Sequence, residues 1–331
     1  MKSIKRTLAK AGINTFFFLL VLSIVLAYIF PEAGRKDSWI PLDTITYYGV
    51  AIIFFFYGVK ISPDSLKSGL SNWKLHLLVQ TSTFLFFPAI ILVLLAMWGS
   101  GLSPLWLGAF YLAALPSTVS SSVVMVSIAK GNLPAAIFNA SASSILGIFI
   151  TPIWMSLFMS SAHGEYELSG TISKLVIQIL IPVAVGFSLH KYLGAFVASQ
   201  QKWLKNFDQT IILLIIFSAF ANSFAERMFE GQSLTALLLL CVLMLALFLV
   251  MMGLMYGLSS LFSFSYADRV TVLFCGSKKS LVQGAVMGKI LFPDPVVFGV
   301  VLLPLMIYHT QQLIVGSALA ERLGAEKGLH E

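Results

Sequence analysis

Two adjacent lysines, Lys278 and Lys279, lie inside an apolar stretch, with Val270 to Phe274 before them and Leu281 to Met287 after them. A lysine at the centre of a membrane helix costs roughly 2.5–3.5 kcal/mol on insertion scales, so other groups must hold its ammonium. All 14 acidic residues can be placed in loops, in tails or at the ends of apolar stretches, which leaves none to pair with these lysines. The remaining partners are backbone carbonyls freed by a helix break, the negative C-terminal end of a helix and an anionic ligand.

The two lysines need not face the same side. Adjacent residues on a helix point roughly 100° apart. We therefore expect at least one lysine to face a binding site, while the other can extend its stem toward water. The alternative is that this stretch is not a membrane span and that both lysines lie in a loop.

The lysines belong to a polar interruption that has a counterpart earlier in the chain. The earlier interruption is 116–122 and the later one is 275–280, and each is followed by an apolar half-helix, a lysine and a proline. Backbone at membrane depth leaves the helix only where protein or a water-filled cavity satisfies its polar groups. Paired interruptions in two halves of a chain indicate a central binding site between broken helices. The alternative is two ordinary kinks, at Pro116 and Gly276.

Polar residues of other apolar stretches are expected to converge on the same depth. The candidate binding residues are Lys278, Lys279, Ser277, Ser280, Ser120, Ser121, Ser122, Asn139, Ser141, Gln80, Thr83 and His309. For each serine or threonine, hydrogen bonding between helices or to its own helix is the alternative. His309 either relays protons or packs as an ordinary buried histidine. Cys241 and Cys275 build no metal or disulfide framework, so no metal is predicted.

The composition indicates what surrounds these residues. Of the 331 residues, 58% are apolar and 11% are charged, and the mean hydropathy is +0.91. A soluble domain has about 45–50% apolar and about 25% charged residues, so a soluble enzyme, a nucleic-acid-binding protein and a disordered chain are all disfavoured. The apolar runs are continuous rather than alternating, which disfavours a β-barrel. The sequence therefore predicts an all-α integral membrane protein.

A membrane-spanning helix needs about 20 mostly apolar residues, and ten stretches meet this description. They are 11–30, 44–59, 73–98, 104–129, 133–159, 171–193, 207–225, 234–262, 266–290 and 295–320. The first follows several basic residues, as in a signal peptide, but no cleavage pattern ends it, and we interpret it as an uncleaved helix.

Ten spans divide into two five-helix repeats, residues 1–160 and 161–331, and the second is inverted because each unit has an odd number of spans. Helices 4 and 9 are then the discontinuous pair that crosses at the interruptions. The pairs Gly253–Gly257 and Gly284–Gly288 have the spacing of close helix contacts, and the second pair would let the ninth span cross the fourth tightly.

The basic residues indicate an orientation. With both termini in the cytoplasm, 14 of the 21 basic residues fall on the inner side and five on the outer side, which is the bias of cytoplasmic loops. The net charge of +7 is thereby explained by topology. We expect both termini to be cytoplasmic, in the inner membrane if the source is bacterial.

These features resemble the bile acid:sodium symporter family, solute-carrier family ten, over nearly the whole chain. The run from Phe274 to Leu281 is most similar to the branch of the seventh vertebrate member. The resemblance implies a core domain of spans three to five and eight to ten, in which the fourth and ninth spans cross at their breaks. Spans one, two, six and seven would form a panel domain, and the substrate would pass between panel and core.

The sodium ligands of that family are not retained at the matching positions. The resemblance places the ninth-span glutamate at Phe274, the following glutamine at Lys278 and the third-span glutamine at Thr83. The fourth-span Ser-Asn pair falls on Ser121 and Ser122. Losing a carboxylate and gaining a cation argues against sodium coupling, and no cofactor is expected.

The leading hypothesis is a secondary transporter that moves a small anionic or amphipathic organic solute by alternating access. In this hypothesis Lys278 or Lys279 takes the place of the coupling sodium of related symporters. A lysine that loses its proton on desolvation could also couple transport to protons. The alternative is a non-transporting membrane regulatory or scaffold protein that retains the transporter fold.

An enzyme is not expected. The serines 120–122 with His309 could be imagined as a nucleophile and a base, but no Gly-x-Ser-x-Gly or His-Glu-x-x-His pattern supports this. The expected partners are a small organic anion and the lipid bilayer, without nucleic acid, and the protein is expected to be a monomer or a homodimer.

Overall fold

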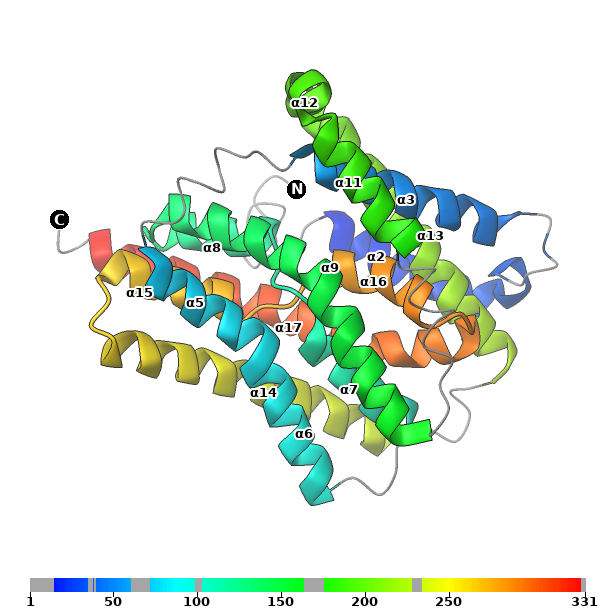
Figure 1. Ribbon diagram of the computed structural model, residues 1–331. Helices are drawn as coiled ribbons and strands as arrows, with labels where there is room; N and C mark the ends of the chain where they lie inside the picture. Colours follow the sequence, from blue (N-terminus) through cyan, green and yellow to red (C-terminus); the bar gives the residue numbers. More distant parts are fainter. Residues whose placement is uncertain are drawn as a thin grey trace, which may run out of the picture.

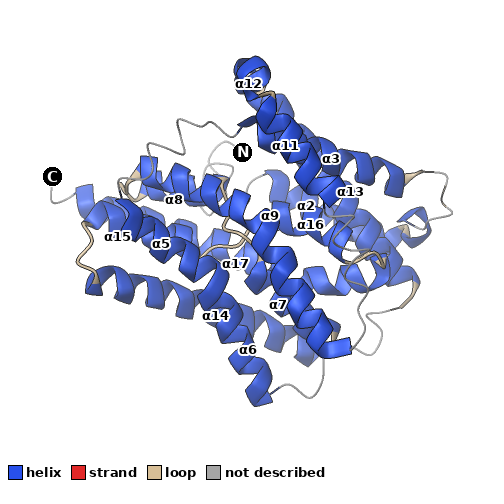
Figure 2. Cartoon of the chain, in the orientation of Figure 1, coloured by secondary structure: helices blue, strands red, loops and turns tan. Residues whose placement is uncertain are grey.

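The computed structural model of the chain describes residues 15–34, 38, 40–60, 72–98, 103–163, 176–227 and 234–328. Every regular element among these residues is a helix, and this described part contains no strand (Figure 2). The elements in chain order are α2 (Thr15–Ile29), η1 (Pro31–Gly34), α3 (Leu42–Lys60), α5 (Trp73–Thr81), η3 (Ser82–Phe86), α6 (Phe87–Trp98), α7 (Pro104–Ala114), α8 (Ser120–Ile128), α9 (Leu133–His163), η4 (Val176–Leu180), α11 (Ile181–Ser188), α12 (His190–Ser199), α13 (Gln201–Ala225), α14 (Leu234–Leu261), α15 (Tyr266–Gly276), α16 (Leu281–Leu291) and α17 (Pro295–Gly328).

The prediction of an all-helical membrane protein is confirmed. Among the described residues, six helical segments are long and apolar enough to cross a membrane: α3, the segment of α5 to α6, α9, α13, α14 and α17. A seventh is counted if 176–188 and α12, which are bent by 96°, form one span. The number that meets this length test is below the predicted ten because α2 is only 15 residues long and two predicted spans are each divided into two short helices, α7 with α8 and α15 with α16.

The helices pack in two groups. In the first group α3 packs against α11, α12 and α13, and α2 packs against α13. In the second group α7 packs against α6, α9 and α17, α15 packs against α5, α8 and α9, and α14 packs against α15 and α17. Helix α13 also contacts α16 and α17, and it thereby joins the groups. Figure 1 shows α3, α11 and α13 together on one side of the molecule, with α6 and α14 at the opposite edge.

Only one of the two Gly-x-x-x-Gly patterns lies at a close helix contact. A Cβ atom on Gly284 would collide with the side chain of Leu305, and one on Gly288 would collide with Phe298 of α17. A close helix contact is therefore confirmed for this pair. The nearest partner is α17, and the predicted partner, the fourth span, contributes Leu115 at 2.6 Å from the Cβ of Gly284 and Tyr111 at 3.1 Å from that of Gly288. Apart from their own helix turn, no atom of the described residues lies within 4 Å of a Cβ placed on Gly253 or Gly257, so the prediction for that pair is wrong within this chain. Neighbouring apolar side chains of α14 are exposed, which shows that this turn of the helix lies on the outer surface of the bundle.

Candidate functional site

The two predicted interruptions are real breaks, and they lie in direct contact. Helix α7 ends at Ala114 and α8 begins at Ser120, while α15 ends at Gly276 and α16 begins at Leu281. The backbone N–H of Ser280 donates to the carbonyl of Pro116 at 2.9 Å. The local reason for the first break is Pro116, because the residue before a proline disfavours the helical region.

Serine hydroxyls of the first break hold the last turn of α15. The Oγ of Ser117 donates to the carbonyl of Cys275 at 2.7 Å, and the Oγ of Ser122 donates to that of Phe274 at 3.1 Å. Because the last carbonyls of a helix have no partner within it, these bonds satisfy groups that the break at Gly276 leaves open.

Neighbouring helices supply further donors to the broken segments. Ser82 donates to the carbonyl of Gly276 at 2.6 Å and Tyr308 donates to that of Ser277 at 2.6 Å. Thr151 donates to the carbonyl of Ala114 at 2.7 Å. The irregular backbone is thus buried in protein and hydrogen-bonded, as the membrane interior requires.

Lys279 is fully buried, and its ammonium donates to three backbone carbonyls. The acceptors are Thr83 at 2.7 Å, Ala113 at 2.6 Å and Leu115 at 2.7 Å. An ammonium has three N–H donors, so all three are used. The same nitrogen lies 4.2 Å from the centre of the Phe87 ring, a cation–π distance. The exposed fraction of Lys279 is 0%, so its ammonium is shielded from bulk solvent.

The carbonyl of Thr83 is free because the helix between α5 and α6 contains a π-turn. The N–H of Phe87 bonds to the carbonyl of Ser82 rather than to that of Thr83, its partner in a regular α-helix. Pro88 has no N–H, so the carbonyl of Phe84 is free as well, and it accepts from the indole of Trp154 at 2.8 Å. The π-turn therefore provides one of the three acceptors of the ammonium.

The backbone of Lys279 is fixed by Gln312 of α17. The Oε1 of Gln312 accepts from the N–H of Lys279 at 2.9 Å, and its Nε2 donates to the carbonyl of Lys279 at 2.8 Å. The Nε2 also lies 2.8 Å from Nδ1 of His309. His309 is thus connected to the lysine through one side chain.

Lys278 is also fully buried but has fewer polar partners. Its ammonium donates to the carbonyl of Ser121 at 3.3 Å and contacts the Sδ of Met125. It lies 5.3 Å from the centre of the Phe274 ring. A thioether is a weak acceptor, so one long carbonyl bond is the main polar contact of this charge. The two ammonium groups have different partners, as expected, but the expectation that one of them could extend toward water is wrong, because both side chains are fully buried.

No acidic side chain forms an ion pair with either lysine in the described part of the chain. Within those same residues, no group of three or more His, Cys, Asp or Glu side chains is placed to hold a metal ion.

Several predicted residues join this site through their backbone rather than their side chains. The hydroxyl of Thr83 bonds to its own helix at Val79, and that of Ser277 bonds to Leu273. Ser280 caps α16 by accepting from the N–H of Gln283 at 3.3 Å. The hydroxyl of Ser121 donates to Thr118 at 3.3 Å. For Thr83 and Ser277, the alternative of bonding to the own helix holds for the hydroxyl.

Three other candidates lie apart from the lysines. The amide of Gln80 donates to Oδ1 of Asn139 at 3.2 Å and to its carbonyl at 3.3 Å, which joins α5 to α9. The Oε1 of Gln80 is buried and has no hydrogen-bond partner in the part of the chain that the structure describes. Ser141 bonds to Ile137 of its own helix. The side chain of Ser120 lies outside the described part of the structure.

Side-chain types did not predict the carbonyls of Ala113 and Leu115 as individual ligands, nor the roles of Phe87, Met125 and Tyr308. A signal for the two carbonyls exists, because a helix that ends before Pro116 leaves its last carbonyls without partners. No signal of that kind marks the aromatic residues, whose positions depend on how α6 and α17 pack.

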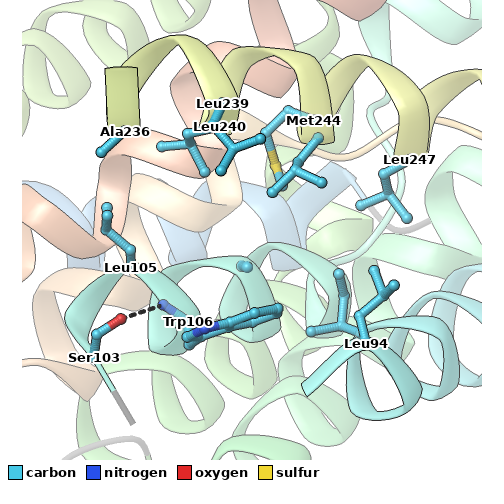
Figure 3. A pocket seen from close by; sticks show the side chains of 12 residues that line it. Leu94, Ser103, Leu105, Trp106, Ala236, Leu239, Leu240, Met244 and Leu247 are labelled. Atoms are coloured by element: carbon cyan, nitrogen blue, oxygen red, sulfur yellow. Dashed lines mark hydrogen bonds between the residues drawn. The ribbon is translucent and has the colours of Figure 1, made fainter. Parts of the chain in front are cut away.

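Two cavities lie beside the broken helices. The larger, of about 520 Å³, lies between α6, α7 and α14 and is lined almost entirely by apolar side chains, with Ser103 and Trp106 on one wall (Figure 3). The smaller, of about 320 Å³, lies where α2 and α13 of the first helix group meet α14, α16 and α17 of the second. His309, Thr310 and Gln311 are among its lining residues. The Oε1 of Gln311 is buried and has no hydrogen-bond partner among the described residues.

Comparisons with known proteins agree with this architecture. Residues 14–325 match the model of the SBF-like CPA transporter family. The chain is 37% identical over 313 residues to the Escherichia coli (strain K12) protein named "Putative symporter YfeH", covering 94% of this chain and 92% of the relative. It is 33% identical over 317 residues to "Sodium/bile acid cotransporter 7" of Danio rerio, covering 94% of each chain. It is 29% identical over 318 residues to the protein of the same name from Rattus norvegicus, covering 95% of this chain and 93% of the relative.

Proposed function

This chain belongs to the SBF-like CPA transporter family, and from that premise we propose that it moves a small anionic or amphipathic organic solute across its membrane by alternating access. The relatives are named as symporters or cotransporters, and the chain is a transporter of this kind rather than an enzyme. The solute class and the coupling mechanism are the proposed part.

The proposed architecture has ten membrane helices in two inverted repeats, residues 1–160 and 161–331. The six candidate spans are joined in this assignment by α2, by the segment 176–188 and by the two divided helices, α7 with α8 and α15 with α16. We assign α2, α3, α11 and α13 to the panel domain and the remaining spans to the core. This assignment is supported by the packing of the helices in two such groups.

One observation carries the proposed mechanism: the ammonium of Lys279 donates to three carbonyls, two of them at the break between α7 and α8. In the related symporters this region is where the resemblance places sodium. A permanent cation on these carbonyls would supply the positive charge that a bound sodium ion supplies elsewhere. Transport by this protein is therefore proposed not to require sodium.

Lys278 is assigned the role of the charge that responds to the solute. Its ammonium has one carbonyl at 3.3 Å and a thioether as partners. A bound anionic group would therefore stabilise the charge of Lys278 more than that of Lys279, which already has three carbonyl acceptors. Because Lys278 is 0% exposed, a solute reaches it only when the two helix groups move apart. The cavity of about 320 Å³ at their junction is the proposed remnant of that path.

The test is uptake by proteoliposomes, with a panel of radiolabelled organic anions measured in sodium and in choline buffers. We expect uptake of at least one anion, equal in both buffers. K278M should abolish it in a protein that still folds, as judged by a monodisperse profile in detergent. The matched control is K74M, because Lys74 lies at the exposed start of α5 and should leave uptake unchanged.

Other outcomes contradict parts of this proposal. Uptake that needs sodium would remove Lys279 from the role of ion substitute. If no anion is transported and none raises the thermal stability of the protein, the non-transporting scaffold becomes the better description. That description is favoured by the burial of both lysines, which a purely structural role would also explain.

A further inference from the structure

Helix α12 turns away from the direction of the spans. Its axis makes an angle of 96° with the segment 176–188 that precedes it. That segment packs along α3, one of the candidate spans. A helix almost perpendicular to a span lies close to the plane of the membrane. In Figure 1, α12 stands at one end of the molecule, beyond the end of α11.

One face of α12 fixes the helix to the protein. Leu193 and Val197 lie one turn apart, and together with Leu204 of α13 they pack around Val59 at the end of α3. Val197 and Leu204 are buried. The position of α12 is therefore fixed by its packing against α3 and α13.

A second face presents large apolar side chains to the outside. Tyr192 and Phe196, also one turn apart, are 75% and 60% exposed, and Trp203 at the start of α13 is 56% exposed. The ring of Trp203 is held by a stacked contact with Phe207 at 5.7 Å and an edge contact with Phe56 at 6.5 Å. Tyrosine and tryptophan prefer the boundary between headgroups and acyl chains.

The same surface is basic. Lys191, Lys202 and Lys205 are exposed, and the segment 190–206 contains no acidic residue. In the described part of the chain none of these lysines forms an ion pair. The next acidic residue, Asp208, is turned inward and faces Lys60 at 4.0 Å. Positive charge is therefore not offset on this surface.

We propose that α12 and the first turn of α13 form an interfacial platform that binds anionic phospholipid headgroups. Tyr192, Phe196 and Trp203 would enter the boundary region of the bilayer, while the three lysines contact lipid phosphates. Exposed aromatic side chains beside lysines, on a helix parallel to the bilayer, are the features of interfacial helices. Because α12 is packed on α3, bound lipid would hold the first helix group at a fixed depth during transport.

The test compares lipid binding by the purified full chain in detergent, using short-chain phosphatidylglycerol and phosphatidylcholine as probes and native mass spectrometry as the readout. We expect the wild type to retain phosphatidylglycerol preferentially. The variant K191Q/K202Q/K205Q should bind phosphatidylglycerol at least roughly tenfold more weakly than the wild type, because each basic residue near an anionic surface contributes to binding. The control is K74Q/R322Q/K327Q, which removes three positive charges elsewhere, at the exposed Lys74 and Arg322 and the half-buried Lys327, and should keep the preference.

A second measurement does not depend on the lysine variants. A chain that keeps Trp203 as its only tryptophan is reconstituted into phosphatidylglycerol vesicles that carry spin-labelled lipids. We expect stronger quenching of Trp203 by labels near the headgroup than by labels at the end of the acyl chain. Equal lipid binding by the two triple variants, full competition by inorganic phosphate, or the absence of quenching by any lipid label would each overturn the proposal.

Discussion

The ammonium of Lys279 lies 2.7 Å from the carbonyl oxygen of Thr83, an oxygen that the π-turn of η3 leaves without its helical partner. Two departures from regular helical structure thus depend on each other. The π-turn frees the carbonyl of Thr83 as an acceptor, and the break between α15 and α16 positions the ammonium of Lys279 as its donor. Neither departure would be stable alone in a bilayer, because an unsatisfied polar group costs several kcal/mol there. π-turns occur frequently at functional sites, and here the turn completes the binding of a buried charge.

Replacing Lys279 by methionine should strongly destabilise the protein. The variant leaves the carbonyls of Thr83, Ala113 and Leu115 buried without their donor, and each such group costs about 1–3 kcal/mol. We expect a loss of about 3 kcal/mol or more, measured as a lower temperature of half-denaturation in detergent. K278M is the matched control and should lose clearly less, because its ammonium has one carbonyl acceptor. Equal losses for the two variants would show that Lys279 has no special structural role.

Gln312 and its neighbour Gln311 should differ in the same assay. Q312L removes both hydrogen bonds to the backbone of Lys279 and leaves a buried N–H and a buried carbonyl unpaired, which predicts a loss of about 2 kcal/mol or more. Q311L removes a single bond to the carbonyl of Cys241 and also removes an Oε1 that has no partner. We therefore expect a smaller loss for Q311L, and the reverse order would contradict the role given to Gln312.

The two breaks and their meeting could be predicted from the sequence. A proline at position 116 and a glycine at 276, each beside small polar residues in an apolar stretch, announce non-helical backbone, and the burial of that backbone requires partners. The sequence did not predict which carbonyls would hold which lysine. That choice depends on the register between α6, α7 and α17, and side-chain types carry no signal for it.

Neither the π-turn nor α12 could be predicted from the sequence, and the reasons differ. Pro88 indicates that the hydrogen bonding of the helix is interrupted, but either a kink or a π-turn can accommodate a proline. In this structure the helix contains a π-turn, and the carbonyls that it leaves free contact Lys279 and Trp154. The segment that forms α12 was divided between the end of the sixth predicted span and a linker. The segment is too short to show a clear helical periodicity. Its apolar residues also lie on two faces, one toward Val59 and one toward the outside.

Ser117, which joins the two breaks, and the candidate residue Ser141 should differ in their effect on stability. S117A removes a buried bond between the two breaks and leaves the carbonyl of Cys275 open, so we expect a loss of about 1–3 kcal/mol in unfolding free energy. S141A removes only a bond to its own helix in an exposed position, and the change should stay within about 0.5 kcal/mol. Denaturation of both variants in the same detergent compares them directly. A larger effect for S141A would return it to the list of site residues.

Truncating Lys279 to alanine should create a site that a soluble cation can fill. The missing part of the side chain is equivalent to propylammonium, and the three carbonyls that held the ammonium remain. We expect K279A to be stabilised by propylammonium, with a rise in half-denaturation temperature that saturates, while the wild type shows none because its own ammonium occupies the place.

Propanol has the same shape without the charge and should not rescue, and K278A should respond less because that position offers one carbonyl and a thioether. Sodium should also stabilise K279A, but not the wild type, if the corresponding carbonyls bind a metal ion in related symporters. If propylammonium stabilises K278A and K279A equally, the rescue reflects a general effect of the salt, and the idea that a lysine has replaced a mobile cation at this position fails.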